Sequence, residues 1–171
     1  MADYDVSNLR ILVVDDYQPM RRIMRHILKE WGIRSPREAS SGQEAIGILR
    51  AEGADLVFTD YKMAPTDGLE LVKQIRSGTS SIDPFTPVIL FTAYTEMKNI
   101  IDARDAGVNE FLAKPISAKS VYQRMRLIID NPRQFVRSKT YNGPDRRRKA
   151  IPIKIPDRRK ATEGATAGRA R

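Results

Sequence analysis

Short apolar runs that alternate with amphipathic segments are the feature that most limits the folds open to this chain. Their spacing predicts strands over residues 9–14, 37–39, 56–59, 87–91 and 109–113, and helices over residues 19–31, 43–51, 68–75, 97–106 and 118–129. Strands that alternate with helices in this way form right-handed crossovers and a parallel sheet covered on both faces. We therefore expect an α/β fold with a doubly wound, five-stranded parallel sheet.

Charge divides the chain into two parts. Residues 1–135 hold 18 Lys and Arg against 18 Asp and Glu, whereas residues 136–171 hold 12 against 3, so the net charge of +9 belongs to the C-terminal end. Helical and strand periodicity also ends after Asn131. We expect one folded domain over 8–131, followed by a flexible, disordered, arginine-rich extension over 132–171 that cannot bury a core of its own.

The residue content excludes several classes of site. The chain has no cysteine and one histidine, His26, which excludes disulfides, thiolate metal sites and multi-histidine sites. It has no apolar stretch of about 18 residues, and its first eight residues are polar and acidic. We expect a soluble, cytoplasmic protein with no membrane insertion.

Polar and charged residues follow four of the predicted strands. They are Asp15 and Asp16 after the first, Asp60 after the third, Thr92 after the fourth and Lys114 after the fifth. Parallel strands bring their carboxyl ends to one edge of the sheet. Three neighbouring carboxylates repel one another and are stable with a cation, and oxygen ligands suit Mg²⁺. A single Asp after a strand is explained as well by a turn or a helix cap, but the whole set is not.

The same residues fit the transfer of a phosphoryl group. A carboxylate such as Asp60 can act as the nucleophile. Asp15 and Asp16 would then hold the metal, and Thr92 and Lys114 would contact the phosphoryl oxygens. Two alternatives remain at this point. One is a metal site that is never phosphorylated, and the other is a metal-dependent phosphatase. The phosphatase is the weaker alternative, because such an enzyme usually has a general acid two residues after its nucleophile, where this chain has a lysine.

Residues 8–130 resemble a response-regulator receiver domain of the CheY type. The resemblance is carried by Asp15-Asp16, Asp60, Asp67-Gly68, Thr92-Ala93, Phe111 and Lys114-Pro115. It implies the flavodoxin-like strand order and a role in two-component phosphorelay signalling, with no enzymatic activity beyond the domain's own phosphoryl transfer and dephosphorylation. It also implies that Asp60 accepts a phosphoryl group from a histidine kinase or phosphotransfer protein. It implies that Mg²⁺ is held by Asp16, Asp60 and the backbone carbonyl of Lys62, and by Asp15 through water.

The resemblance further implies that Thr92 and Phe111 rearrange together on phosphorylation and change the face made by the fourth helix, fifth strand and fifth helix. The chain departs from the family pattern in three places. Pro65 stands one residue later than the proline that often follows the acceptor, and Phe111 lacks the hydroxyl of the usual tyrosine. Lys62 and Tyr94 stand where side chains influence attack by water, which leaves the lifetime of the phosphoryl group open.

A near-repeat marks the basic extension. Gly143-Pro144-Asp145-Arg146-Arg147-Arg148 is followed twelve residues later by Ile155-Pro156-Asp157-Arg158-Arg159. Guanidinium groups pair with guanine O6 and N7 and stack on planar rings, and a carboxylate accepts from the N1 and N2 hydrogens of guanine. Two copies therefore fit a ligand with two guanines and two phosphates, which describes cyclic di-GMP.

The extension resembles that of the CheY-like cyclic di-GMP effectors. This resemblance implies that the ligand is bound by residues of both copies, namely Asp145, Arg146, Arg147, Arg148, Asp157, Arg158 and Arg159. It also implies docking on a partner protein such as the flagellar motor. Two alternatives are a tail that binds nucleic acid, as other arginine-rich segments bind RNA, and a solvated tail with no specific ligand.

Overall fold

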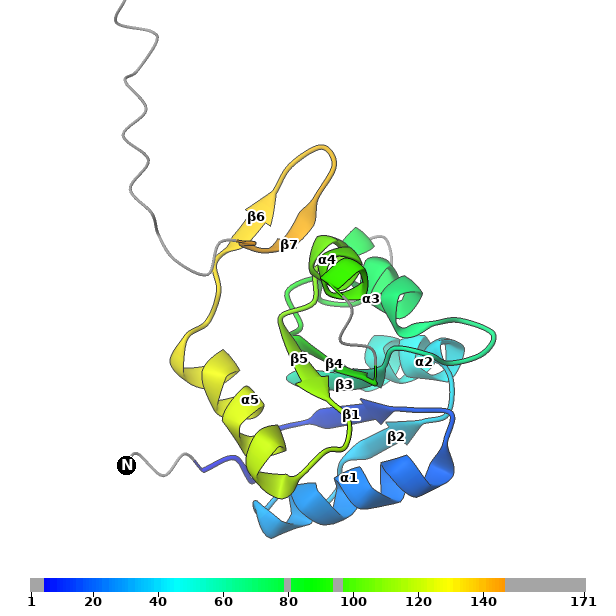
Figure 1. Ribbon diagram of the computed structural model, residues 1–171, viewed down its shortest axis with the longest axis vertical. Helices are drawn as coiled ribbons and strands as arrows, with labels where there is room; N and C mark the ends of the chain where they lie inside the picture. The colour runs from blue at the N-terminus through cyan, green and yellow to red at the C-terminus, as the bar shows by residue number, and fades with distance from the viewer. Residues whose placement is uncertain (1–4, 79–80, 94–96, 147–171) are drawn as a thin grey trace, which may run out of the picture.

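Five parallel strands form the centre of the fold, in the order β2-β1-β3-β4-β5 (Figure 1). The strands are β1 (Ile11–Val14), β2 (Arg37–Ala39), β3 (Leu56–Asp60), β4 (Val88–Thr92) and β5 (Glu110–Ala113). This computed structural model describes residues 5–78, 81–93 and 97–146. The observed strand order confirms the predicted doubly wound, flavodoxin-like sheet.

Five helices cover the two faces of this sheet. They are α1 (Gln18–Glu30), α2 (Gly42–Glu52), α3 (Gly68–Ser77), α4 (Met97–Ala106) and α5 (Ala118–Asp130). One core cluster joins α1 and α5 to alternate strand residues such as Val13 and Phe58, and the other joins α2, α3 and α4 to the intervening residues such as Val14 and Val57. Strands this apolar are buried on both faces, which is why their sequences read as continuous apolar runs.

Side chains at the helix starts fix several of the boundaries. Ser41 accepts a hydrogen bond from the backbone N–H of Glu44 and caps α2. Ser117 and Ser120 form a capping box at the start of α5. These caps satisfy backbone N–H groups that the first helical turn leaves without partners.

The segment after α5 corrects the predicted domain boundary at residue 131. Strands β6 (Phe135–Arg137) and β7 (Asn142–Pro144) pair antiparallel, and the N–H of Asp145 donates to the carbonyl of Gln134 at 2.7 Å. The Phe135 ring packs edge-on against Phe85, with 4.9 Å between ring centres. Folded structure therefore extends at least to Pro144. The pattern missed it because each strand has three residues and the packing relies on a few separated side chains.

The rest of the extension lies outside the described residues. This includes five of the seven residues expected to bind the tail ligand, namely Arg147, Arg148, Asp157, Arg158 and Arg159.

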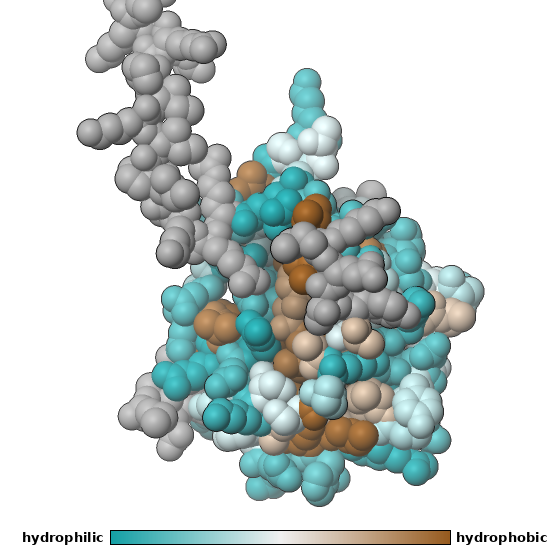
Figure 2. Space-filling model, in the orientation of Figure 1, coloured by the Kyte–Doolittle hydropathy of each residue, from teal (hydrophilic) through white to brown (hydrophobic). Residues whose placement is uncertain are grey.

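On the viewed face, hydrophobic residues gather in patches between wider hydrophilic areas (Figure 2). Within the described ranges, none of the helices has the length and apolar character that crossing a bilayer requires.

Candidate functional site

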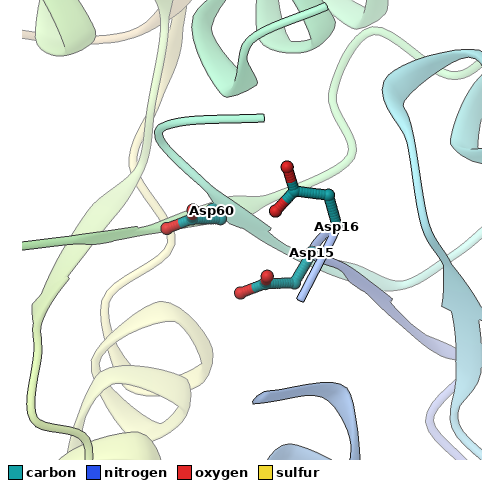
Figure 3. A group of neighbouring side chains, drawn as sticks. All are labelled: Asp15, Asp16 and Asp60. Carbon is teal, nitrogen blue, oxygen red and sulfur yellow. The ribbon is translucent and has the colours of Figure 1, made fainter. Parts of the chain in front are cut away.

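Three carboxylates meet at the edge of the sheet where the strands end. Val14 of β1 is paired with Thr59 of β3, so the next residues, Asp15 after β1 and Asp60 at the end of β3, lie side by side. Asp16 follows from the same loop, and the three side chains converge (Figure 3). One carboxylate oxygen from each of the three lies within 4.8 Å of the others. The structure therefore brings together the acids that the sequence analysis singled out.

Lys114 supplies the positive charge of this pocket. Its Nζ lies 2.8 Å from Oδ1 of Asp60 and 3.7 Å from Oδ2 of Asp15. The lysine follows the last residue of β5, and its backbone N–H donates to the carbonyl of Thr92 at 2.9 Å. Thr92 is the last residue of β4 and is buried, so its hydroxyl-bearing side chain belongs to the same edge of the sheet. The Lys114–Pro115 peptide bond is cis.

Asp15 is the most deeply buried acid of the pocket. Its Oδ1 accepts a hydrogen bond from the N–H of Tyr17 at 2.8 Å, whereas its buried Oδ2 has no hydrogen-bond partner within the described residues. Burial raises the pKa of Asp15, and the negative charges of Asp60 and Asp16 raise it further, against the opposing effects of the Tyr17 N–H and Lys114.

The arrangement suits a hard cation. A buried carboxylate oxygen without a hydrogen-bond donor is costly unless a positive charge compensates it. Lys114 approaches this oxygen only to 3.7 Å, beyond hydrogen-bonding distance. The three acids offer only oxygen ligands, and Asp16 is exposed at the mouth of the pocket. Oxygen donors with an open side match Mg²⁺, which usually keeps several of its waters.

Close packing fixes the loop after Asp60. Asp67 caps α3 by accepting from the N–H of Glu70 at 2.8 Å. The N–H of Gly68 donates to the carbonyl of Tyr61 at 2.9 Å, and a Cβ at Gly68 would collide with the carbonyl oxygen of Asp60. A glycine is therefore required at the start of α3, where its backbone approaches that of Asp60.

Arg21 supports the loop after β1, and the sequence analysis did not identify it. Its Nη1 donates to the carbonyl of Asp15 at 2.6 Å, and its Nε lies 3.4 Å from Oε2 of Glu38. The arginine fixes the backbone that carries Asp15. No local pattern indicated this, because Arg21 reads as one of several basic residues on a helix and Glu38 is distant in sequence.

The other residues implied by the receiver resemblance are Lys62 in the loop after β3, Phe111 on β5 and Tyr94. Lys62 is exposed in the loop after β3, where the Ala64–Pro65 peptide bond is cis. Phe111 is half-buried on β5 and packs against the core on the α2–α3–α4 side. Tyr94 lies outside the described residues.

Two of the expected ligand residues in the first arginine-rich copy, Asp145 and Arg146, are among the described residues. Asp145 is half-buried directly after β7, and Arg146 lies 3.3 Å from Oδ1 of Asp105 in α4. The guanidinium carbon of Arg146 is 4.0 Å from the centre of the Tyr141 ring. The roles of Tyr141 and Asp105 could not be predicted from the sequence, because their contacts with Arg146 depend on how the hairpin packs.

Comparisons with known proteins agree with this geometry. The family model described as the response regulator receiver domain matches residues 11–126. Chemotaxis protein CheY-3 of Vibrio cholerae is 34% identical over 124 residues, which cover 72% of this chain and 94% of that protein. Chemotaxis protein CheY of Pseudomonas aeruginosa is 31% identical over 122 residues, 71% of this chain and 97% of that protein.

Similarity to solved structures extends this agreement to the fold. The crystal structure of a two-component response regulator from Clostridium difficile superposes with a TM-score of 0.65 at 27% identity. The superposition covers 72% of this chain and 98% of that one. The family match ends at residue 126, before the β6–β7 hairpin and the two arginine-rich copies.

Proposed function

This chain belongs to the response regulator receiver family, and on that premise we propose that Asp60 accepts a phosphoryl group from a histidine kinase or a phosphotransfer protein. Receiver domains are signalling proteins rather than enzymes with a separate substrate. The observation that carries the proposal is the pocket itself, where Lys114 lies 2.8 Å from Asp60 beside two further carboxylates. We place the protein in the cytoplasm as a phosphorelay response regulator.

Each residue of the pocket has a role in this transfer. A carboxylate oxygen of Asp60 attacks phosphorus, and the donor's leaving group departs with the electron pair of the broken bond. Lys114 and the Thr92 hydroxyl hold the oxygens of the transferred group. Asp15, Asp16, Asp60 and the carbonyl of Lys62 would hold Mg²⁺, which neutralises negative charge on those oxygens when bound.

We propose that the signal leaves through the α4–β5–α5 face. Thr92 and Phe111 lie on adjacent paired strands, since Leu90 of β4 is in register with Phe111 of β5. Thr92 itself is in register with Ala113, two residues after Phe111, and Phe111 is only half-buried, so we expect it to respond to a movement of Thr92. The similar proteins of V. cholerae and P. aeruginosa are chemotaxis proteins, which supports a downstream protein partner such as the flagellar motor.

Labelling tests the acceptor. Incubation with acetyl phosphate and Mg²⁺ should add one labile phosphoryl group, measured by intact-protein mass spectrometry, and Asp60→Ala should abolish it. Asp67→Asn is the matched control, because Asp67 is a nearby acid that caps α3 and does not belong to the acidic cluster. Labelling that persists in Asp60→Ala would refute the assignment.

We also propose that the C-terminal extension binds cyclic di-GMP. The support is chemical. Each copy pairs arginines with an aspartate, a combination that matches the acceptor and donor edges of guanine, and Arg146 already lies on an aromatic ring. The proposed ligands are Asp145, Arg146, Arg147, Arg148, Asp157, Arg158 and Arg159.

Calorimetry of the full chain with cyclic di-GMP tests this second proposal. Replacing Arg158 and Arg159 with alanine should weaken binding strongly. Replacing Arg169 and Arg171, which removes the same charge outside the copies, should change the affinity little. The absence of heat with the wild-type chain, or equal losses in the two double variants, would contradict specific binding. Tighter binding to RNA than to cyclic di-GMP would favour a nucleic-acid ligand instead.

A further inference from the structure

A cavity of about 720 Å³ lies between the β6–β7 hairpin and the C-terminal parts of α3 and α4. Helices that connect parallel strands run back along the sheet, so this cavity lies near the edge where the strands begin, away from the Asp60 pocket. Its polar lining combines the basic residues Lys73, Arg137 and Lys139, the carboxylates of Asp102 and Asp105, and the ring of Tyr141. None of these residues has a role in the phosphoryl transfer proposed above.

Arg76 fixes the hairpin beside this cavity. The residue is 3% exposed, and its guanidinium carbon lies 5.1 Å from the centre of the Phe135 ring. Its main-chain carbonyl accepts a hydrogen bond from Nδ2 of Asn142 at 2.7 Å. A Cβ at Gly143 would lie 3.0 Å from Cα of Gly107 and 2.7 Å from Oη of Tyr141. The first arginine-rich copy therefore begins from a strand with a fixed position on the receiver fold.

Arg146, the first arginine of that copy, is held on two sides. One face of its guanidinium covers the Tyr141 ring at 4.0 Å, and Nη1 lies 3.3 Å from Oδ1 of Asp105. The hydroxyl of Tyr141 donates to the carbonyl of Pro144 at 2.6 Å, which fixes the ring. The Arg146 side chain is still 40% exposed. An arginine held in this way loses less conformational freedom when a ligand binds than a fully mobile one.

We propose that Tyr141 and Asp105 are positioning residues of the nucleotide site. They hold the guanidinium of Arg146 as a platform on which a guanine base of the ligand stacks, while Lys73 and Arg137 of the cavity wall face its phosphates. The inference rests on the proposed binding of cyclic di-GMP by the tail. Through Lys73 and Asp105, helices α3 and α4 of the receiver domain would then belong to a ligand site that the sequence assigned to the tail alone.

Two substitutions test the inference, because a positioning role and a purely electrostatic tail predict different changes in the affinity for cyclic di-GMP. Tyr141→Leu changes no charge, so binding driven only by net charge would be unaffected, whereas loss of the platform should raise the Kd for cyclic di-GMP about tenfold. Asp105→Asn removes a negative charge, so a purely electrostatic tail should bind the anionic ligand more tightly. A positioning role predicts the opposite, a Kd about three to ten times higher.

Conservative variants separate the positioning of Arg146 from a general loss of folded structure. Tyr141→Phe and Asp105→Glu should restore the affinity to within about threefold of the wild type, because the ring and the carboxylate remain. Asp130→Asn is the control for removing an acid from an exposed ion pair on another helix. Asn142→Ala weakens the attachment of the hairpin to Arg76 without touching the partners of Arg146, so it should cost much less affinity than Tyr141→Leu.

The outcomes distinguish this inference from the proposal on which it rests. If the wild-type chain does not bind cyclic di-GMP, both are overturned. If it binds and Asp105→Asn binds equally or more tightly, while Tyr141→Leu is unchanged, only the positioning role is overturned. Equal losses in Tyr141→Leu and Asn142→Ala would likewise refute positioning and leave the tail-ligand proposal standing.

Discussion

Replacing Arg76 with methionine should destabilise the folded protein by about 3 to 5 kcal/mol. The guanidinium donates to four acceptors, which are the carbonyls of Pro84, Thr86 and Gly107 and the Oδ1 atom of Asn109, at 2.7 to 3.1 Å. Methionine has a similar length but no donor, so these acceptors lose their partner. This arginine therefore joins the α3–β4 and α4–β5 loops into one unit.

The size of this destabilisation depends on how many acceptors lose their only hydrogen-bond donor in Arg76→Met. Oδ1 of Asn109 keeps the N–H of Val88 at 2.9 Å, so the uncompensated loss falls on the three carbonyls. A buried acceptor without its donor costs about 1 to 3 kcal/mol. Part of this is offset because the buried charge is itself unfavourable, and burial lowers the pKa of Arg76 to about 10. At pH 7 the side chain is still charged, so the comparison is between a hydrogen-bonded cation and an apolar side chain.

Urea unfolding provides the assay, with Trp31 as the reporter. It is the single tryptophan of the chain, and its ring stacks on Tyr122 of α5 at 4.1 Å, far in sequence from the substitution. Arg126→Met is the matched control, because Arg126 pairs with Asp130 on the surface of α5 and its loss should cost at most about 0.5 kcal/mol. A loss below about 1 kcal/mol in Arg76→Met would refute the reasoning.

Two further predictions concern the acidic pocket. Burial raises the pKa of Asp15, so the native state binds this proton more tightly than the unfolded chain, and the wild type should gain stability as the pH falls through the raised pKa towards the ordinary value. In Mg²⁺-free buffer at pH 7, Asp15→Asn should therefore be more stable by about 1 to 2 kcal/mol, lose that pH dependence and no longer gain stability on addition of Mg²⁺. Thermal unfolding checks this, and an Asn variant less stable than the wild type would contradict it. Gly68→Ala should lower stability by about 2 kcal/mol and slow phosphorylation, because its Cβ displaces the Asp60 carbonyl. Gly47→Ala, in an open position of α2, should instead stabilise by about 0.5 to 1 kcal/mol, and equal effects of the two substitutions would count against the packing argument.

The sheet and its acidic edge could be predicted from sequence because their signals are local. Each central strand is a continuous apolar run, and the polar residue that ends it stands next in the sequence, as Asp15 follows Val14. Parallel pairing then brings those ends together without any knowledge of side-chain contacts. The boundaries differed by a residue or two, as at β1, which begins at Ile11 rather than at residue 9.

The hairpin could not be predicted because its stability depends on long-range contacts. Phe135 is followed by two exposed residues in a strand of only three, and Asn142-Gly143 is a pair typical of a turn rather than a strand. Their partner, Arg76, lies more than 50 residues earlier and reads as a charged residue at the end of a helix, where exposure is the usual outcome. The sequence analysis assigned residues 135–144 to a flexible extension, and nothing in the sequence reveals that they meet Arg76.

Helix α4 connects the two proposed inputs of this protein. The helix follows the strand that ends at Thr92, and near its C-terminal end it presents Asp105 to Arg146. Arg146 bridges a carboxylate on α4 and a ring on the hairpin, so any movement of α4 relative to the hairpin changes the distance between the two partners of its guanidinium. A phosphoryl group that repositions α4 must then alter the preorganisation of Arg146, and hence the affinity for the tail ligand. Thermodynamic linkage requires that the ligand alter the free energy of the phosphorylation-induced change by the same amount. If phosphorylation moves α4, the contact between Asp105 and Arg146 would therefore couple the two proposed inputs.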